Sequence, residues 1–180
     1  LYVARPRTHV LGNVPDSIAY RSVDQYPTAQ TVPGILILEF AAPIYFANAS
    51  YLRERILRWI DEEEDKLKLS GETSLHYVIL SMGAIGCIDT SGISMLEEVK
   101  NITDRRGLKV VIANPRGEVM KKLDRSKLIE SVGQEWVFLT VWEAVGACKY
   151  MLHTTYASGK KSSSSSISVG EPETRTNTIV

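Results

Sequence analysis

Apolar and polar positions alternate in blocks along the chain, and the blocks predict strands separated by helices. Apolar residues run almost unbroken through residues 34–40, 75–82, 108–113 and 136–139. Short runs of this kind are typical of strands in a sheet that is covered on both faces. Between the runs, apolar residues recur every three or four positions, which predicts amphipathic helices. Strands that alternate with helices in this way predict an α/β domain with a mostly parallel sheet.

The helices have recognisable start signals. We expect the first helix to begin with Asn48 as its N-cap and to end near Lys66. Asn114 would cap a later helix with proline at the first helical position, and Thr140 with Glu143 forms a capping box. The later helices are expected over residues 94–106, from residue 114 through residue 123, over residues 126–132, and from residue 140 through residue 152.

The two ends of the chain differ from this core. Residues 1–33 contain two short segments, at 8–12 and 18–21, that we expect to be edge strands because prolines interrupt the region. The core is expected to span residues 34–156. From residue 157 to residue 180 the chain is polar and includes five consecutive serines, so we expect a disordered tail.

Composition and charge indicate a globular protein. The 180 residues are 44% hydrophobic and 23% charged, and 21 basic side chains balance 21 acidic ones, so net charge does not favour nucleic-acid binding. No apolar run approaches the roughly 20 residues that span a bilayer. The chain starts at Leu1 without an initiator methionine. We therefore expect a segment of a longer protein, with any membrane-spanning part upstream.

The motif at residues 88–93, Ile-Asp-Thr-Ser-Gly-Ile, lies between a predicted strand and a predicted helix. Asp89, Thr90 or Ser91 can each cap the first N–H groups of that helix, which is the structural interpretation. The functional interpretation is an exposed hydroxyl at a helix N-terminus, where an added phosphate is electrostatically favoured. The two interpretations are compatible.

The sequence lacks the common motifs of catalysis and nucleotide binding. It contains no phosphate-binding loop, no nucleophile elbow and no histidines at metal-ligand spacing. The cluster Arg53, Arg55 and Arg58 could bind an anion, although a solvated helix face is the simpler interpretation. We expect Cys87 and Cys148 to be reduced, buried thiols. These observations predict a binding or regulatory module, not an enzyme, with no cofactor and no metal.

At residues 88–93 the sequence resembles a STAS domain, the module shared by sulfate transporters and bacterial anti-sigma-factor antagonists. Further segments resemble the C-terminal region of plant SulP-type sulfate transporters, with a leaning to their third group, and the match covers residues 5–152. These segments are Arg5-Pro6-Arg7-Thr8, Tyr26-Pro27, Val32-Pro33-Gly34, Ile44-Tyr45-Phe46-Ala47-Asn48, Leu52-Arg53-Glu54-Arg55-Ile56, Ala113-Asn114-Pro115 and Leu139-Thr140-Val141.

The resemblance implies a fold and a setting. The fold would be a central, mostly parallel sheet of about four strands with flanking antiparallel edge strands and four to five helices. Residues 1–33 would follow an upstream membrane domain that moves sulfate with protons, at the plasma membrane or a plastid or endomembrane. The chain itself would act on the cytosolic face in transport control, trafficking and dimerisation. Its partners would be that membrane domain, a second copy of the full-length protein, cytosolic regulatory proteins and a kinase.

The resemblance also implies functional residues. Ser91 matches the phosphorylated serine of the anti-sigma-factor antagonists, Thr90 is the neighbouring hydroxyl and Asp89 is the motif acid. Two alternatives for the whole chain remain open, a stand-alone phospho-switch protein and a weak nucleotide-binding module. The C-terminal Thr178-Ile179-Val180 resembles a carboxylate-capture motif.

The loop before the first helix is a second candidate site. Ile44, Tyr45, Phe46 and Asn48 should lie beside the same edge of the sheet as the 88–93 motif, because loops that follow parallel strands cluster there. The loop would contact the membrane domain or another partner. Alternatively, Tyr45 and Phe46 simply fill the core.

Overall fold

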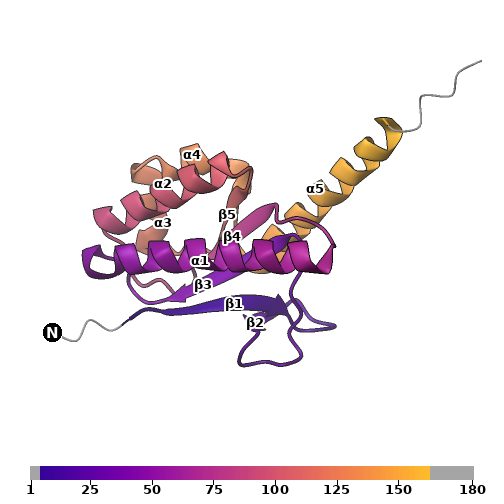
Figure 1. Cartoon of the computed structure of the whole chain (residues 1–180). Helices are drawn as coiled ribbons and strands as arrows, with labels where there is room; N and C mark the ends of the chain where they lie inside the picture. Colours follow the sequence, from indigo (N-terminus) through magenta and orange to yellow (C-terminus); the bar gives the residue numbers. More distant parts are fainter. Residues whose placement is uncertain (1–4, 163–180) are drawn as a thin grey trace, which may run out of the picture. The chain divides into compact units, whose positions relative to one another are not determined.

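One mixed sheet organises the computed structural model of the chain, which describes the backbone of residues 5–162 and the side chains of residues 5–158 (Figure 1). Its described strands follow the order β2-β1-β3-β4-β5-β6. They are β1 (Arg7–Asn13), β2 (Tyr20–Ser22), β3 (Ile35–Ala41), β4 (Tyr77–Ser81), β5 (Lys109–Ala113) and β6 (Val137–Phe138). Strands β3 to β6 are parallel, whereas β1 pairs antiparallel with β2 and β3.

At least one helix follows each of the parallel strands. The helices are α1 (Phe46–Ser70), α2 (Thr90–Arg105), α3 (Gly117–Arg125), α4 (Leu128–Val132) and α5 (Val141–Ser162), with a short 3-10 helix at Gln134–Trp136. Helices α1 and α2 pack side by side (Figure 1). Four parallel strands, two antiparallel strands and five helices within the described residues confirm the predicted fold class, although β1 lies inside the sheet, between β2 and β3, and is not the edge strand that we expect from the sequence.

The core lies between the sheet and the helices that follow its strands. Alternate residues of β3, such as Leu36, Leu38 and Phe40, belong to the same buried cluster as Leu52 and Ile56 of α1. The intervening residue Ile37 is fully buried as well. Burial of both faces of β3 explains why its sequence is almost continuously apolar.

Helix α1 begins three residues before the predicted position. Asn48 is not its N-cap, because the helix starts at Phe46 and Tyr45 is the capping residue. The Asn48 side chain reaches back instead, and its Oδ1 accepts a hydrogen bond of 3.0 Å from the backbone N–H of Tyr45. Asn48 therefore still stabilises the helix start, as the third helical residue.

The predicted helix start at Asn114 is also wrong. Asn114 adopts a left-handed conformation with φ of 53° and donates its backbone N–H to the Phe138 carbonyl at 2.8 Å, which continues the pairing of β5 with β6. Its side chain packs so closely on Gly83 that a Cβ there would lie 2.3 Å from Nδ2. Asn114 thus ends a strand, and α3 begins only at Gly117.

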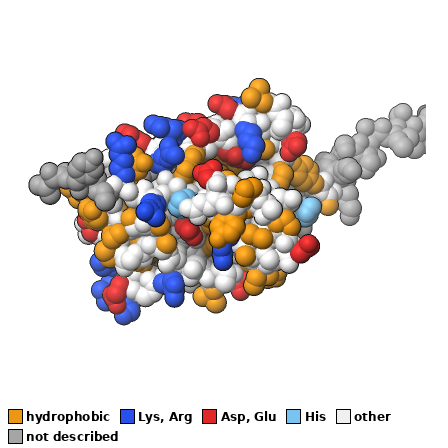
Figure 2. Space-filling view, turned by 90° about the horizontal axis from the view of Figure 1, so that it is seen from below, with side chains coloured by type: hydrophobic (Ala, Val, Ile, Leu, Met, Phe, Trp, Pro, Cys, Tyr) orange, Lys and Arg blue, Asp and Glu red, His pale blue; other side chains and the backbone are white. Residues whose placement is uncertain are grey.

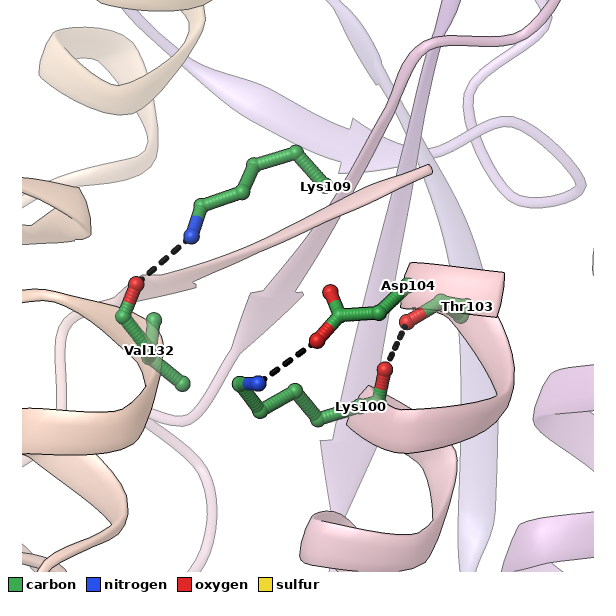
Figure 3. A network of polar contacts seen from close by, with 5 residues as sticks. All are labelled: Lys100, Thr103, Asp104, Lys109 and Val132. Atoms are coloured by element: carbon green, nitrogen blue, oxygen red, sulfur yellow. Dashed lines mark hydrogen bonds and ion pairs between the residues drawn. The ribbon is translucent and has the colours of Figure 1, made fainter. Parts of the chain in front are cut away.

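Polar contacts join β5 to the end of α4 (Figure 3). The Lys109 Nζ donates to the carbonyl of Val132, the last residue of α4, at 2.6 Å, and it also lies 5.5 Å from the centre of the Trp136 ring. A cation at this position neutralises the negative end of the helix. Burial lowers the pKa of Lys109. Nearby on α2, Lys100 pairs with Asp104 at 2.6 Å.

Helix α5 opens as predicted and ends later than predicted. The Thr140 Oγ1 accepts a hydrogen bond of 3.1 Å from the Glu143 N–H, which confirms Thr140 as the cap. The helix then continues to Ser162, inside the stretch expected to be a disordered tail. From Lys149 onward the chain forms a unit of its own, whose described part is the later part of this helix. The remaining predicted tail, including residues 178–180, lies outside the described residues.

Charged side chains are interspersed on the surface. On the face seen from the side of β1 and β2, Lys and Arg lie among Asp and Glu (Figure 2). This mixture is consistent with a formal net charge of zero. None of the helices in the described part of the chain has an apolar stretch long enough to cross a bilayer.

Candidate functional site

The Asp89 carboxylate joins the starts of two helices. Its Oδ1 accepts a hydrogen bond of 2.9 Å from the N–H of Gly92 in α2. Its Oδ2 accepts another, of 3.0 Å, from the N–H of Phe46 in α1. Of the three predicted caps of α2, Asp89 is the one that serves as N-cap, and it caps α1 at the same time.

Backbone pairing locks the two loops together. Ile44 forms an isolated parallel bridge with Ile88, with the Ile44 N–H donating to the Cys87 carbonyl at 2.9 Å and the Asp89 N–H to the Ile44 carbonyl at 3.0 Å. The Lys122 Nζ donates to the Ile88 carbonyl at 2.9 Å. Both isoleucine side chains are buried. The structure therefore brings the 88–93 motif and the loop before α1 to one place, as predicted.

Gly92 permits this close approach. A Cβ on Gly92 would lie 2.6 Å from Ile88 Cγ1 and 2.8 Å from Ile44 Cγ2. Distances this short are sterically prohibited, so the motif requires a residue without a side chain at this position. Gly92 is thus a packing residue that lets α2 begin directly against both loops.

The loop before α1 divides into buried and exposed residues. Asn48 is only 3% exposed, and its Nδ2 donates to the Pro43 carbonyl at 2.8 Å. Ile44 is fully buried, whereas Tyr45 is 39% and Phe46 is 82% exposed. The alternative prediction that Tyr45 and Phe46 fill the core is therefore wrong, because Ile44 takes that place. The two aromatic side chains lie on a loop that hydrogen bonds to the side chains of Asn48 and Asp89 hold in place.

A hollow of about 380 Å³ lies between the first turns of α1 and α2. Thr90 is exposed and Ser91 is partly buried at this position. Across the hollow, Arg53 of α1 and Glu98 of α2 form an ion pair at 2.6 Å. The lining residues are Phe46, Ala49, Ser50, Arg53, Thr90, Ser91, Ser94, Met95 and Glu98.

Sequence reasoning missed part of this lining. Ser94 and Glu98 follow Ser91 by three and seven residues, so helical spacing places all three on one face of α2. Ser50 and Arg53 share a face of α1 in the same way. Periodicity could have identified each wall. The two walls face each other because of the way α1 and α2 pack. Residue spacing within one helix carries no information about that packing.

The groups around the hollow are suited to presenting or binding a group. No histidine or cysteine lines the hollow, and the described residues include no cluster of His, Cys, Asp or Glu that could hold a metal ion. Both Asp89 oxygens already accept backbone N–H groups. Four hydroxyls, a helix N-terminus and one arginine remain, and such groups suit a phosphoryl group.

The predicted cysteine environments are half correct. Cys148 is buried, and burial raises the pKa of its thiol to about 12, which makes it inert. Cys87 is exposed, so the prediction of a buried thiol is wrong there. Only its backbone carbonyl is used in the bridge to Ile44, and its side chain is left on the surface loop.

The three predicted arginines have different roles. Arg53 lines the hollow. The Arg55 guanidinium lies 4.6 Å from the centre of the Trp59 ring and covers that aromatic face. Arg58 is exposed on the helix surface. A shared anion site formed by all three is therefore not present.

Comparisons with known proteins identify this architecture. The family model described as STAS domain matches residues 26–144. “Sulfate transporter 3.1” and “Sulfate transporter 3.2” of Arabidopsis thaliana are 66% and 60% identical over 86% of this chain, which covers 24% of each of them. The chain thus spans about a quarter of the length of the curated relatives it matches. The expected resemblance to the third plant group is confirmed.

Solved structures share the fold. The murine Slc26a9 anion transporter aligns with a TM-score of 0.67 at 22% identity, over 81% of this chain and 22% of that one. The STAS domain of a SulP transporter from Vibrio cholerae aligns with a TM-score of 0.54 at 20% identity, over 73% of this chain and 94% of that one. The sheet order and helix arrangement are therefore those of a recurring domain.

Proposed function

Because the chain belongs to the STAS domain family, we propose that it is the cytosolic regulatory domain of a proton-coupled sulfate or anion transporter. It acts on the membrane domain of the same protein, in transport control, trafficking and dimerisation. The observation that carries this proposal is the hollow between α1 and α2, where Thr90 and Ser91 lie beside the exposed Phe46. The 66% identity to a much longer sulfate transporter supports the setting.

Phosphorylation of Ser91 or Thr90 by a kinase is the proposed switch. A phosphate adds about −1.5 to −2 charges, and the N-terminus of α2 favours that charge. Asp89, however, lies next to both hydroxyls and holds α1 and α2 through its two hydrogen bonds. Repulsion between the phosphate and Asp89 would weaken these bonds and so loosen the loop that carries Tyr45 and Phe46.

The exposed loop is the proposed contact surface. Tyr45 and Phe46 present apolar area at a fixed position, because Asn48 and Ile44 anchor the loop on either side. Large exposed aromatic side chains on a rigid support are typical of protein contacts. The partner is the membrane domain, with cytosolic regulatory proteins competing for the same surface once the loop is loosened.

The domain-level test measures anion uptake by the full-length transporter in a transport-deficient host, together with its abundance at the cell surface. Removal of residues 1–180 is expected to lower uptake per surface molecule if the domain controls the transport cycle. Loss of surface protein would instead assign it a role in folding or delivery. Unchanged uptake and abundance would contradict the regulatory proposal.

The residue-level test uses Ser91→Ala and Thr90→Ala in the same transporter. Both are expected to raise uptake per surface molecule, because the phosphate that would loosen the loop can no longer be added, while the caps of α1 and α2 remain. Ser50→Ala is the matched control, since Ser50 lines the opposite wall of the hollow and is not a predicted acceptor. Equal behaviour of all three variants would argue against the phosphorylation switch.

The alternatives are less well supported. A stand-alone phospho-switch protein fits poorly with a chain that covers 24% of a relative to which it is 66% identical. For the nucleotide-binding module, the absence of a phosphate-binding loop in the sequence argues against tight binding. We therefore retain the transporter domain as the single proposal.

A further inference from the structure

Arg53 holds a position from which it can change partners. Its Nη1 binds the Glu98 Oε1 at 2.6 Å, and both side chains are partly exposed at the rim of the hollow, by 35% and 50%. The Arg53 Nε is buried and has no hydrogen-bond partner among the described residues. A guanidinium carries five N–H donors, so the pair with Glu98 uses only part of its capacity.

We infer that Arg53 binds the phosphate when Ser91 is phosphorylated, and that it gives up Glu98 to do so. This inference rests on the phosphorylation proposed above. Arg53 and Ser91 line opposite walls of one hollow of about 380 Å³. Side chains in a helix lean toward its N-terminus, which directs Arg53 of α1 toward the level of Ser91.

Charge favours the exchange. A phosphoserine carries up to two negative charges and three acceptor oxygens, whereas Glu98 offers one charge and two oxygens. Arginine binds such groups through two parallel hydrogen bonds. Because the ion pair with Glu98 is partly exposed, it contributes little and is easily given up. The phosphate would therefore compete successfully for Arg53.

No other cation can take this role within the described lining of the hollow. Arg53 is the one basic residue among the nine that form it. Arg55 is engaged with the Trp59 ring. The phosphate would meet two carboxylates nearby, those of Asp89 and Glu98, and Arg53 is the cation of the lining that offsets them, while Lys122 of α3 donates to the Ile88 carbonyl.

The consequence is a change at the surface between α1 and α2. In the unphosphorylated chain, the Arg53–Glu98 pair links α1 to α2. Arg53 lies seven residues after Phe46, and Glu98 lies seven residues after Ser91. After the exchange, Arg53 is drawn toward the helix starts and Glu98 becomes a free negative charge. A partner that rests on Phe46 would then meet a more acidic rim.

The test introduces phosphoserine at position 91 during synthesis of the 180-residue chain, so that no kinase is needed. The second ionisation of the phosphate is followed by ³¹P NMR across pH, with Arg53→Gln as the variant and Arg58→Gln as the matched control. A cation in contact stabilises the dianion, so the phosphate pKa should be about one unit lower in the parent chain than in Arg53→Gln. Arg58→Gln should match the parent.

A second variant removes the charge of Glu98, the partner that Arg53 gives up in the exchange. Glu98→Gln frees Arg53, so the phosphate pKa should fall below that of the parent. Equal phosphate pKa values in the parent, Arg53→Gln and Arg58→Gln chains would overturn the inference. Arg53→Lys should keep part of the lowering of the phosphate pKa, because the positive charge remains. Far-ultraviolet circular dichroism melts of each variant check that the fold is retained.

The two proposals fail separately. If Ser91→Ala leaves uptake unchanged in cells, the regulatory role fails, while the NMR result for Arg53 is unaffected. If the phosphate pKa ignores Arg53, the exchange fails, while Ser91 can still be the acceptor that controls uptake.

Discussion

The packing of two loops against the start of α2 depends on the absence of a side chain at Gly92. Gly92 lies where α2 starts, with Ile88 and Ile44 closing on it from two loops. The polar motif around it attracts attention because of its hydroxyls. Its glycine, however, serves packing alone, and any side chain would push the two loops apart.

Gly92→Ala should therefore destabilise the fold. The added methyl would approach the Ile88 side chain to 2.6 Å, and overpacking of this kind costs about 1–3 kcal/mol. Urea unfolding measures the loss. Gly86→Ala is the matched control, because a Cβ there meets nothing within 4 Å. A Gly92→Ala chain as stable as the Gly86→Ala chain would show that the loops can move aside.

At the scale of elements, Asp89 couples two helices that lie far apart in the sequence. It caps α2 from its own loop and α1 across 43 positions. The start of each helix therefore depends on the same carboxylate, and the first turns of both should open together.

Asp89→Ala should reduce the protection of the backbone amides at the starts of both helices against hydrogen exchange. Removal of one cap costs about 1 kcal/mol, so the loss of both hydrogen bonds should cost roughly 2 kcal/mol. Amide hydrogen exchange should become faster at Phe46 as well as at Gly92. Thr140→Ala is the control, since Thr140 caps α5 alone. Faster exchange confined to Gly92 would mean that α1 starts independently of Asp89.

Local patterns predicted most elements but not the contacts between them. The apolar runs located the four parallel strands to within a residue or two, because burial on both faces leaves a clear signal. Asn48 and Asn114 were both mistaken for N-caps, since an asparagine in that position fits several turns. Asp89 was one cap among three candidates in the sequence, and only the packed loops show why it serves two helices.

The candidate site, like the fold, could be predicted only in part from the sequence. Ser91 and Thr90 could be named from the 88–93 motif, and the structure places them on an accessible hollow. Ser94 and Glu98 could have been found from helical spacing. The position of Arg53 opposite them could not, because it depends on the angle at which α1 and α2 pack. Exposure of Cys87 likewise depends on the path of one loop.

At the scale of the whole molecule, alkaline pH should destabilise the fold through Cys148. Burial raises the pKa of this thiol from its ordinary value of 9.0 to about 12. Above pH 9 the unfolded thiol ionises while the folded thiol stays neutral, so the free energy of unfolding falls, by roughly 2–3 kcal/mol near pH 11. Below that range the contribution of Cys148 is complete.

Cys148→Ala isolates this effect. The variant should be less stable at neutral pH, because a buried side chain is truncated, but its stability should decline less between about pH 9 and 11. Burial also raises the pKa of Tyr20 and Tyr77, so some decline above pH 10 should remain in both chains. Urea unfolding at a series of pH values measures the slope. Parallel slopes would exclude Cys148 as the group responsible.

The strand order has a consequence for how the chain is made. Strands β3, β4, β5 and β6 lie side by side in the order in which they occur in the sequence, and β3 pairs with β1, which precedes it. As the ribosome releases the chain from its N-terminus, each new parallel strand finds its neighbour already synthesised. Only the newest strand then presents an open edge on the growing side, and the two-residue β6 leaves that edge short when the sheet is complete.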